Sequence, residues 1–464
     1  MNNYDTDTIV AISSPPGRGA IGVVRLSGGK TLAIAGKLFT DMRGGKIASF
    51  NEREVYHGRL IDDDAACIDE VLMFVMKGPR SFTGEDMVEI SCHGNPIILG
   101  NVVDACVKSG ARIARPGEFT KRAFINGKID LTQAEAVAEL IRARNESAVS
   151  IAMGNVTGRL RSRIGALRDG LVSVLASLEA SIDFPEEDIN PETGGLCKNS
   201  IIKHIKECDV ILKSSEEAGW LINGLRVAIV GKTNAGKSSL FNRLLDKERS
   251  IVTAHKYTTR DLVEEEVVID GINVVFTDTA GIESDHAGEV EIESMKRSRD
   301  AIDRSDLLLF VVDRSCDWSD QDREIAGGLG LKSGIAVFNK SDLPEGMKRD
   351  EIPDAISAWP SVEVSSLYGL GIEDVKDIMV RLYRERCGRE ESENAICCNL
   401  RHANSLRDCR DALQRAVDAG NNGYHEEIVA MELRRAVDSL GEITGEDAGE
   451  DLLNAIFSTF CIGK

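Results

Sequence analysis

The chain has 464 residues, 42% of them hydrophobic and 28% charged, which is typical of a globular protein with room for two or three domains. Its formal net charge of −20 excludes a protein that wraps a nucleic-acid backbone over its whole surface. No apolar run is long enough to span a membrane and the start lacks a secretion signal, so we expect a cytoplasmic protein without membrane attachment. Eleven cysteines without a metal-binding spacing are expected to be reduced thiols.

In the first half of the chain, the predicted secondary structure changes near residue 126. Residues 1–126 mix short β-rich runs with glycine turns, which predicts a small α+β domain. Residues 127–222 are helical in pattern, because apolar side chains recur at steps of three and four. The stripe consists of Leu160, Ile164, Leu167, Leu171, Val174 and Leu178, and after an interruption at 183–188 it resumes with Ile201, Ile205, Cys208 and Leu212.

Residues 223–386 alternate apolar strands with polar helical segments, which predicts a parallel sheet covered by helices. Asp270-Gly271 between two strands predicts a hairpin and therefore one antiparallel edge. Helical stripes return over 387–464 and the chain finishes on C-I-G-K. We therefore expect an α/β domain inserted into a helical domain whose two halves flank it.

The stretch GKTNAGKS at 231–238 fits G-x4-G-K-S, and it follows a predicted strand and precedes a helix. Glycines at this spacing let backbone N–H groups curl around phosphates at a helix N-terminus. Lys237 is expected to reach the β and γ phosphates, and the Ser238 hydroxyl to ligate Mg²⁺.

Two later motifs specify a guanine nucleotide. Asp278 of D-T-A-G is expected near the magnesium, and Asp342 of N-K-S-D can accept from both the ring N–H and the amine of guanine. The stretch SSL at 365–367 follows another strand, as a last base-contacting loop would. The residues expected at GTP are Asn234, Ala235, Gly236, Lys237, Ser238, Ser239, Thr253, Thr258, Thr259, Asp278, Thr279, Ala280, Gly281, Asn339, Lys340, Asp342, Ser365 and Ser366.

The segment YTTRD at 257–261 is read as the first switch region. Thr259 is expected to be the second hydroxyl ligand of Mg²⁺, ordered only while the γ-phosphate is present. The alternative, two β-forming residues at the start of a strand, stays open. Ile282 stands where Ras-type enzymes carry the glutamine that orients water, so hydrolysis must use another residue or a partner.

Asn234 before A-G-K, the switch T-T-R-D and the ending IFSTFCIGK together resemble the MnmE (TrmE) family of tRNA-modification GTPases. SFTGEDMVEISCHG and RPGEFTKRAFINGKID extend the resemblance to the N-terminal part, so it covers nearly the whole chain. The resemblance implies a multidomain α/β plus all-α protein. Its expected parts are a folate-binding and dimerisation domain (1–126), a helical domain in two halves (127–222 and 387–464) and an inserted Ras-like G domain (223–386).

The resemblance also implies a potassium ion beside the phosphates, held by Asn234, Thr253, His255 and Thr258. It implies Glu291 as the catalytic residue that positions the attacking water; the alternative is an exposed helix glutamate among several. Tyr257 stands where the family usually has glycine, so the potassium loop is expected to be stiffer here.

The activity that the resemblance implies is carried out with an FAD-dependent partner, MnmG, in a heterotetramer built on a homodimer. A one-carbon unit from 5-formyltetrahydrofolate or another tetrahydrofolate derivative would become part of an aminomethyl or carboxymethylaminomethyl group on C5 of the wobble uridine of tRNA. The implied folate contacts are Arg25, Glu89, Lys128 and Lys464. Cys461 is either a catalytic thiol or a packing residue beside Phe460.

A second interpretation belongs to another class of function: a regulatory GTPase switch, for example in ribosome assembly, that modifies no nucleoside. The G motifs alone do not exclude it. The N-terminal domain and the C-I-G-K ending favour modification, because a bare switch needs neither.

Overall fold

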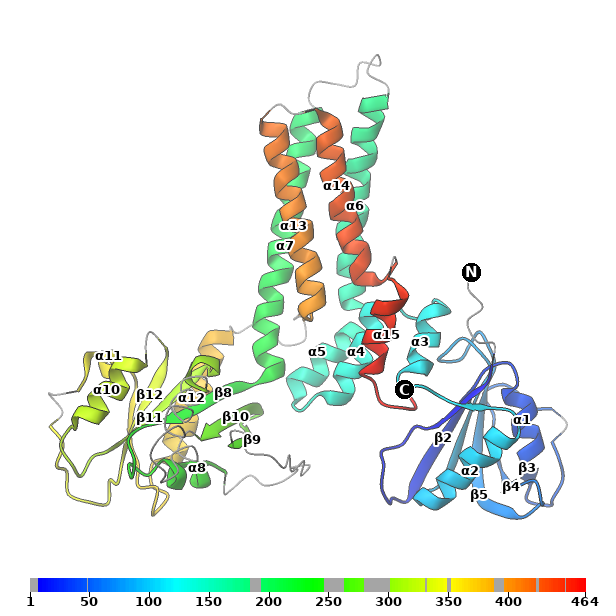
Figure 1. Cartoon of the computed structure of the whole chain (residues 1–464), viewed down its shortest axis with the longest axis horizontal. Coiled ribbons are helices and arrows are strands. Elements are labelled where there is room, and N and C mark those ends of the chain that lie inside the picture. The colour runs from blue at the N-terminus through cyan, green and yellow to red at the C-terminus, as the bar shows by residue number, and fades with distance from the viewer. Residues whose placement is uncertain are drawn as a thin grey trace, which may run out of the picture. The chain divides into compact units, whose positions relative to one another are not determined.

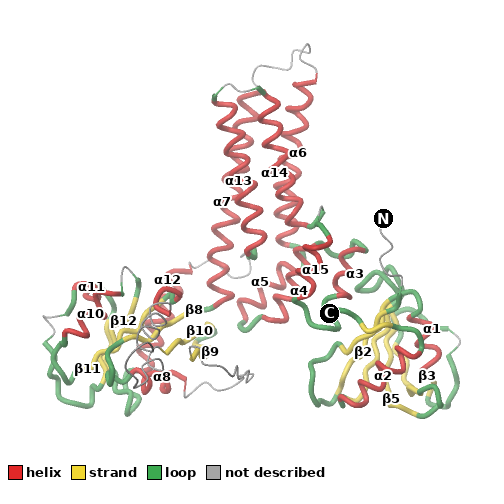
Figure 2. The backbone as a smooth tube through the Cα atoms, in the orientation of Figure 1, coloured by secondary structure: helices red, strands yellow, loops and turns green. Residues whose placement is uncertain are grey.

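The computed structural model divides into two compact units, each described here by itself (Figures 1 and 2). The first unit comprises residues 1–141, 155–209 and 398–464, and the second comprises 142–154 and 210–397. The described residues are 7–47, 49–183, 193–245, 263–278, 301–329, 332–348, 352–387, 396–422, 425–446 and 448–464.

The first unit begins with a seven-stranded sheet in the order β3-β4-β5-β6-β2-β1-β7. Its neighbouring strands are antiparallel, except that β7 lies parallel to β1. The short β-rich runs predicted in residues 1–126 are confirmed as strands, for example β2, β5 and β6. The strands are β1 (Ile9–Ile12), β2 (Ile21–Ser27), β3 (Phe39–Asp41), β4 (Val55–Ile61), β5 (Cys67–Met76), β6 (Met87–His93) and β7 (Arg112–Ile113).

Helices α1 (Thr31–Leu38) and α2 (Pro96–Lys108) cover one face of this sheet. Helix α2 begins where it does because the Asn95 side chain accepts from the Ile97 N–H, and Pro96 needs no partner in the first turn. Alternation along the strands sends Val24 and Ile90 into the core beneath the helices. The register pairs Arg25 with Glu89 on the opposite face.

The helical part of the structure confirms the apolar stripes. Leu160, Ile164, Leu167 and Leu171 are buried, and helix α13 packs against α14, which packs against α6. Val174 and Leu178, further along the predicted stripe, are only half-buried. The helices are α3 (Glu118–Ile125), α4 (Leu131–Arg142), α5 (Glu146–Val156), α6 (Arg159–Asp183), α7 (Thr193–Asn223), α13 (Leu400–Asn421), α14 (Glu426–Thr444) and α15 (Glu450–Ser458).

The second unit contains a six-stranded sheet in the order β13-β12-β11-β8-β10-β9. The strands are parallel except for β9, which pairs antiparallel with β10, so the hairpin predicted at Asp270-Gly271 is confirmed. The strands are β8 (Leu225–Val230), β9 (Val263–Ile269), β10 (Ile272–Asp278), β11 (Leu307–Asp313), β12 (Gly334–Asn339) and β13 (Ser361–Glu363).

Helices lie on both faces of this sheet. Helices α8 (Lys237–Leu245) and α12 (Ile372–Cys387) contribute to the core on one face. Helices α10 (Asp320–Gly328) and α11 (Asp354–Ser357) contribute to the core on the other. The carboxyl ends of five neighbouring parallel strands therefore meet at one edge, where ligands bind in sheets of this kind.

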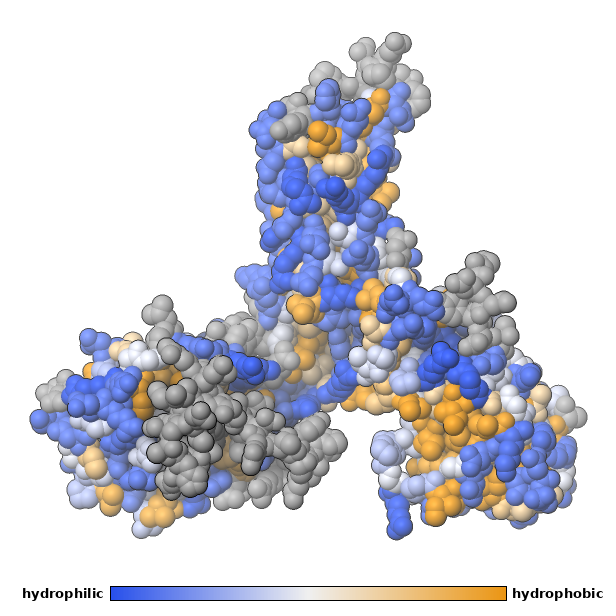
Figure 3. All heavy atoms as spheres, in the orientation of Figure 1, coloured by the Kyte–Doolittle hydropathy of each residue, from blue (hydrophilic) through white to orange (hydrophobic). Residues whose placement is uncertain are grey.

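The surface of the helical segments is mostly hydrophilic on the face shown in Figure 3. Within the described parts of the chain, every helix is too short or too polar to cross a membrane.

Candidate functional site

The loop at 231–236 joins β8 to α8 in a tightly curled conformation. Gly231 has a φ of +151°, and a side chain there would collide with the carbonyl oxygen of Val311. Gly236 has a φ of +97°, and its Cβ would collide with the Asn339 amide. Asn234 takes a left-handed φ of +62°, which asparagine tolerates better than most residues. A loop of this shape at a helix N-terminus is typical of an anion-binding site.

Lys237 folds back over this loop. Its side chain is buried, and its ammonium donates to the carbonyl oxygens of Gly231 at 2.7 Å and Lys232 at 3.0 Å. The ammonium thus closes the loop and places a positive charge at the predicted phosphate position. Ser238 and Ser239 are exposed on the first turn of α8.

Asn339 connects two loops that are far apart in sequence. Its Nδ2 donates to the Ala235 carbonyl at 2.9 Å, and its Oδ1 accepts from the N–H and the hydroxyl of Ser366 at 3.1 and 2.9 Å. Asn339 is 2% exposed, so a bound nucleotide would contact only a small part of its side chain. The loops after β8, β12 and β13 are therefore held as one surface.

The predicted base-recognition residues lie together beside this surface. Asp342 is exposed, and its Oδ1 accepts from the Ser365 hydroxyl at 2.5 Å. Lys340 has a φ of +62° and pairs with Asp313 at 2.6 Å. Burial of the Asp313 carboxyl opposes ionisation, but its hydrogen bonds from Lys340 and Ser315 outweigh burial and lower its pKa. The sequence analysis did not predict Asp313 as a residue of this site. An acidic residue at the end of an apolar strand could have indicated it.

Several predicted residues fall outside the part of the chain that the structure describes. Asp278 is the last residue of β10, and its backbone register with Ile229 places it beside the start of the P-loop. Among the described residues, no three His, Cys, Asp or Glu side chains gather into a metal site. Outside the described residues are Thr253, His255, Tyr257, Thr258, Thr259, Thr279, Ala280, Gly281, Ile282 and Glu291.

The C-terminal tail docks on the N-terminal sheet within the first unit. The Gly463 carbonyl accepts from the Ser13 hydroxyl at 3.0 Å and from Arg25 at 3.3 Å. The Gly117 N–H donates to the Cys461 carbonyl at 3.4 Å. Gly463 has a φ of +93°, and a Cβ there would collide with the Ile12 carbonyl, so only glycine fits.

The sheet register pairs Arg25 with Glu89, and the docked tail adds Lys464, so three of the four predicted folate residues lie near one another. Arg25 pairs with Glu89 at 2.7 Å, and its guanidinium lies 6.0 Å from the Phe82 ring and 5.6 Å from the Phe119 ring. The bond from Arg25 to Gly463 puts Lys464 one residue away along the chain. Lys128 donates to the Pro79 carbonyl at 2.9 Å, in the loop that also carries Phe82.

Cys461 is exposed, so its thiol contributes little to packing beside Phe460. The sequence analysis did not predict the residues that hold the C-terminal tail. Ser13, Gly117 and Gly463 act through backbone groups or a single hydroxyl, and such contacts leave no pattern in one sequence.

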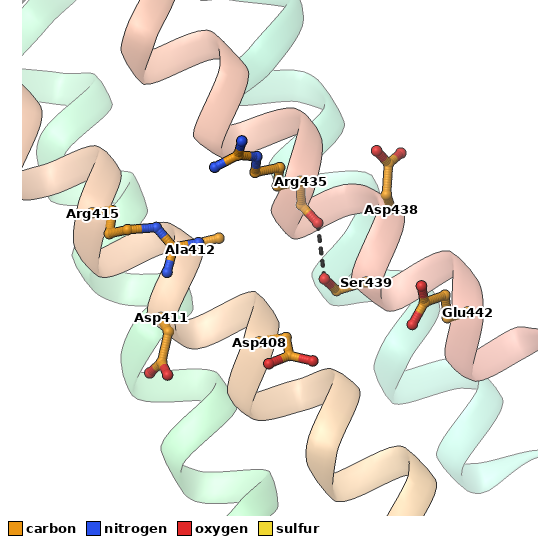
Figure 4. A pocket seen from close by; sticks show the side chains of 8 residues that line it. All are labelled: Asp408, Asp411, Ala412, Arg415, Arg435, Asp438, Ser439 and Glu442. Atoms are coloured by element: carbon orange, nitrogen blue, oxygen red, sulfur yellow. Dashed lines mark hydrogen bonds between the residues drawn. The ribbon is translucent and has the colours of Figure 1, made fainter.

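A further hollow of about 330 Å³ lies between α13 and α14 (Figure 4). Its arginines are paired within the protein, because Arg415 and Arg435 both bind Glu432, at 2.9 and 2.7 Å. Its lining residues are Asp408, Asp411, Ala412, Arg415, Arg435, Asp438, Ser439 and Glu442, and none of them belongs to a predicted site.

The parallel sheet, its curled P-loop and the Asn339-linked base loop define a P-loop GTP-binding protein. Two family models identify the family within this class. The model "GTP-binding protein TrmE N-terminus" matches residues 8–128, and "MnmE helical domain" matches residues 131–461. The chain belongs to the MnmE family of tRNA modification GTPases.

Similar proteins agree over the full length. The tRNA modification GTPase MnmE of Geotalea uraniireducens is 41% identical over 463 residues, covering 99% of this chain and 100% of the relative. The MnmE of Thermotoga maritima is 40% identical over 460 residues, covering 99% and 100%. Among solved structures, Era of Aquifex aeolicus bound to GDP and AlF4⁻ matches with a TM-score of 0.27 and 24% identity, over 40% of this chain and 66% of Era. At that score the match does not bear on the fold.

Proposed function

We propose that the protein hydrolyses GTP in the course of modifying the wobble uridine of tRNA. Family membership supports the general role. The proposal for the chemistry rests mainly on one observation: the Gly463 carbonyl accepts hydrogen bonds from both Ser13 and Arg25. These bonds hold the end of the chain, with Cys461 and Lys464, beside the Arg25–Glu89 pair. We assign the folate-binding domain to 1–126, the helical domain to 127–222 and 387–464, and the G domain to 223–386.

In the proposed GTP site, Lys237 takes the β and γ phosphates while the loop N–H groups surround them. Ser238 and Thr259 hold Mg²⁺, which neutralises charge on the phosphates when bound. Asn234, Thr253, His255 and Thr258 hold a potassium ion, and Glu291 orients the attacking water. Asp342 accepts from the guanine base, supported by its bond from Ser365.

In the proposed folate site, the residues fit an anionic ligand with an amino-pyrimidine edge. The Glu89 carboxylate accepts from that edge, and Arg25, Lys128 and Lys464 hold the glutamyl tail. The side chains of Arg25 and Glu89 are 16% and 29% exposed, so both can be reached. A tetrahydrofolate derivative would supply the one-carbon unit when bound. Cys461 is exposed and lies two residues before Gly463, whose carbonyl Arg25 binds.

We propose a homodimer that works in the cytoplasm with tRNA and the FAD-dependent MnmG in a heterotetramer. The GTPase cycle would then drive a conformational change rather than chemistry on the base.

The test is mass spectrometry of wobble uridines in tRNA from a deletion strain that carries wild-type, Asp342→Asn or Cys461→Ser protein. We expect the modified uridine to be lost on deletion, restored by the wild type and not restored by Asp342→Asn. Cys461→Ser, which is expected to hydrolyse GTP normally in vitro, should fail to restore it if the thiol takes part in the chemistry.

Unchanged wobble uridines in the deletion strain would overturn the modification function and favour a regulatory switch. Full restoration by Cys461→Ser would assign the thiol a structural role only.

A further inference from the structure

A buried ion pair joins the P-loop to helix α10. Lys232, the second residue of the loop, extends to Asp322 of α10, with its ammonium 2.8 Å from Oδ2. The Lys232 and Asp322 side chains are 18% and 0% exposed. Lys232 fills a variable position of G-x4-G-K-S, and Asp322 lies outside the G-x4-G-K-S, D-x-x-G and N-K-x-D motifs.

Asp322 does more than cap its helix. It is the third residue of α10 and forms a capping box with Ser319, whose hydroxyl and N–H donate to Oδ2 at 2.5 and 3.1 Å. A carboxylate that served only this box would remain in water, where ionisation costs nothing. Here it is fully buried, and Oδ1 has no hydrogen-bond partner among the described residues. Burying a carboxylate in this way requires a compensating cation, and Lys232 provides it.

The pair acts on the part of the loop that holds Lys237. The Lys232 carbonyl accepts from the Lys237 ammonium at 3.0 Å and from the Ala235 N–H at 3.3 Å. Anchoring the Lys232 side chain to Asp322 of α10 therefore fixes the carbonyl that positions Lys237. Since Asp322 neutralises the Lys232 ammonium, Lys232 is not available as a second phosphate ligand.

We propose that Lys232 and Asp322 are positioning residues of the nucleotide site. Their ion pair holds loop 231–236 in the phosphate-receiving conformation before GTP arrives, so that binding need not order the loop. A preorganised loop binds more tightly because less conformational freedom is lost on association. This inference rests on the GTP site proposed above and concerns residues outside its ligand contacts.

The test separates positioning from stability by removing both charges at once. Lys232→Met alone leaves a buried carboxylate unpaired and should destabilise the protein strongly. The double variant Lys232→Met/Asp322→Leu replaces the pair with apolar side chains and should regain most of that stability. Ser319→Ala is the matched control, because it removes the helix cap but keeps the pair.

Binding of fluorescently labelled GDP to the full chain is followed by stopped-flow, with thermal unfolding of each variant measured in parallel. We expect the double variant to lose about tenfold in affinity, mainly through faster dissociation, while Ser319→Ala dissociates like the wild type. A double variant that is stable and dissociates at the wild-type rate would overturn the proposal.

If the double variant does not fold, Lys232→Gln takes its place, because it retains a donor for Asp322 without the charge. Dissociation faster than from Lys232→Arg would support positioning, and equal rates would overturn it. Failure of the wild-type protein to bind labelled GDP would count against the proposed GTP site itself, and so is distinguished from failure of the ion-pair proposal.

Discussion

Asp342 is the residue on which base recognition is expected to depend. Its carboxylate is exposed next to the buried Asn339, and the Ser365 hydroxyl fixes one of its oxygens. The rigid part of the site is thus made of Asn339, Ser365 and Ser366, while the carboxylate itself faces the solvent that a base would displace.

Asp342→Asn should lower GDP affinity by about a hundredfold or more, since one of the two guanine donors would lose its acceptor in a site built to bind it. The amide of the variant can instead donate to the 2-oxo group of xanthine, so affinity for XDP should rise. Competition between labelled GDP and XDP measures both effects. Ser341→Ala, next to it in the same loop, is the control, and an unchanged GDP affinity for Asp342→Asn would contradict the assignment.

At the scale of secondary-structure elements, a buried charge cluster joins α4 to the start of α13. Glu135 accepts from Arg401 at 2.7 Å and from His402 Nε2 at 2.6 Å, and Arg401 also donates to the carbonyls of Glu442 and Ile443 at the end of α14. Burial opposes ionisation of Glu135, but the hydrogen bonds from His402 and Arg401 lower its pKa from 4.5 to about 2. Three helices are fixed to one another at this carboxylate.

His402 is held in its neutral form. Burial lowers its pKa below 6.5, although the Glu135 carboxylate acts in the opposite direction. Its Nδ1 accepts from the Asn399 N–H at 3.3 Å, which leaves Nε2–H to donate to Glu135. The neutral ring is thus satisfied on both sides.

Glu135→Gln should lower the free energy of unfolding by about 3 kcal/mol at pH 7, because it leaves Arg401 without its carboxylate. Glu135 has a lower pKa in the folded state, so its contribution is complete above pH 4.5 and is lost as pH falls towards about 2. Urea unfolding from pH 7 to pH 2 should show the wild type and variant converging below pH 4.5. A difference that stays constant with pH would contradict this account, and Glu446→Gln, at the exposed Arg168 pair, is the control.

At the scale of the whole chain, the tail joins its last residues to its first strands within the first unit. Gly463 lies against Ser13, 450 positions earlier. Helix α15 prepares this contact, because Phe457 and Phe460 are buried and the Phe457 carbonyl lies close against Gly117. The end of the chain is therefore a fixed part of the first unit.

Gly463→Ala should release the tail, since the new methyl group would collide with the Ile12 carbonyl at a φ of +93°. Amide hydrogen exchange at 461–464 should become faster, and wobble-uridine modification should fall at least about tenfold while GTP hydrolysis is unchanged. Ile462→Ala, at a side chain that is 55% exposed, is the matched control. Normal exchange and modification in Gly463→Ala would show that the docked tail is dispensable.

Local features of the sequence predicted the elements and the nucleotide loop. Burial of one helix face requires apolar side chains at steps of three and four, and the predicted stripe residues Leu160, Ile164, Leu167 and Leu171 are buried. The P-loop depends on Gly231 and Gly236 shortly before Lys237, and the hairpin on Asp270-Gly271. Each of these features depends on a few residues that are close in sequence, so each can be recognised from the sequence alone.

The contacts that make these elements into sites were decided by tertiary structure alone. Lys232 and Asp322 are 90 positions apart, Ala235 and Asn339 are 104, and Arg25 and Gly463 are 438. Each is a single hydrogen bond or ion pair between ordinary residues, and neither partner differs locally from the same residue on an unpaired surface. Only the fold brings each pair within 3.5 Å. At that distance Lys232 and Asn339 hold the nucleotide loop, and the Gly463 carbonyl holds the tail, in one conformation.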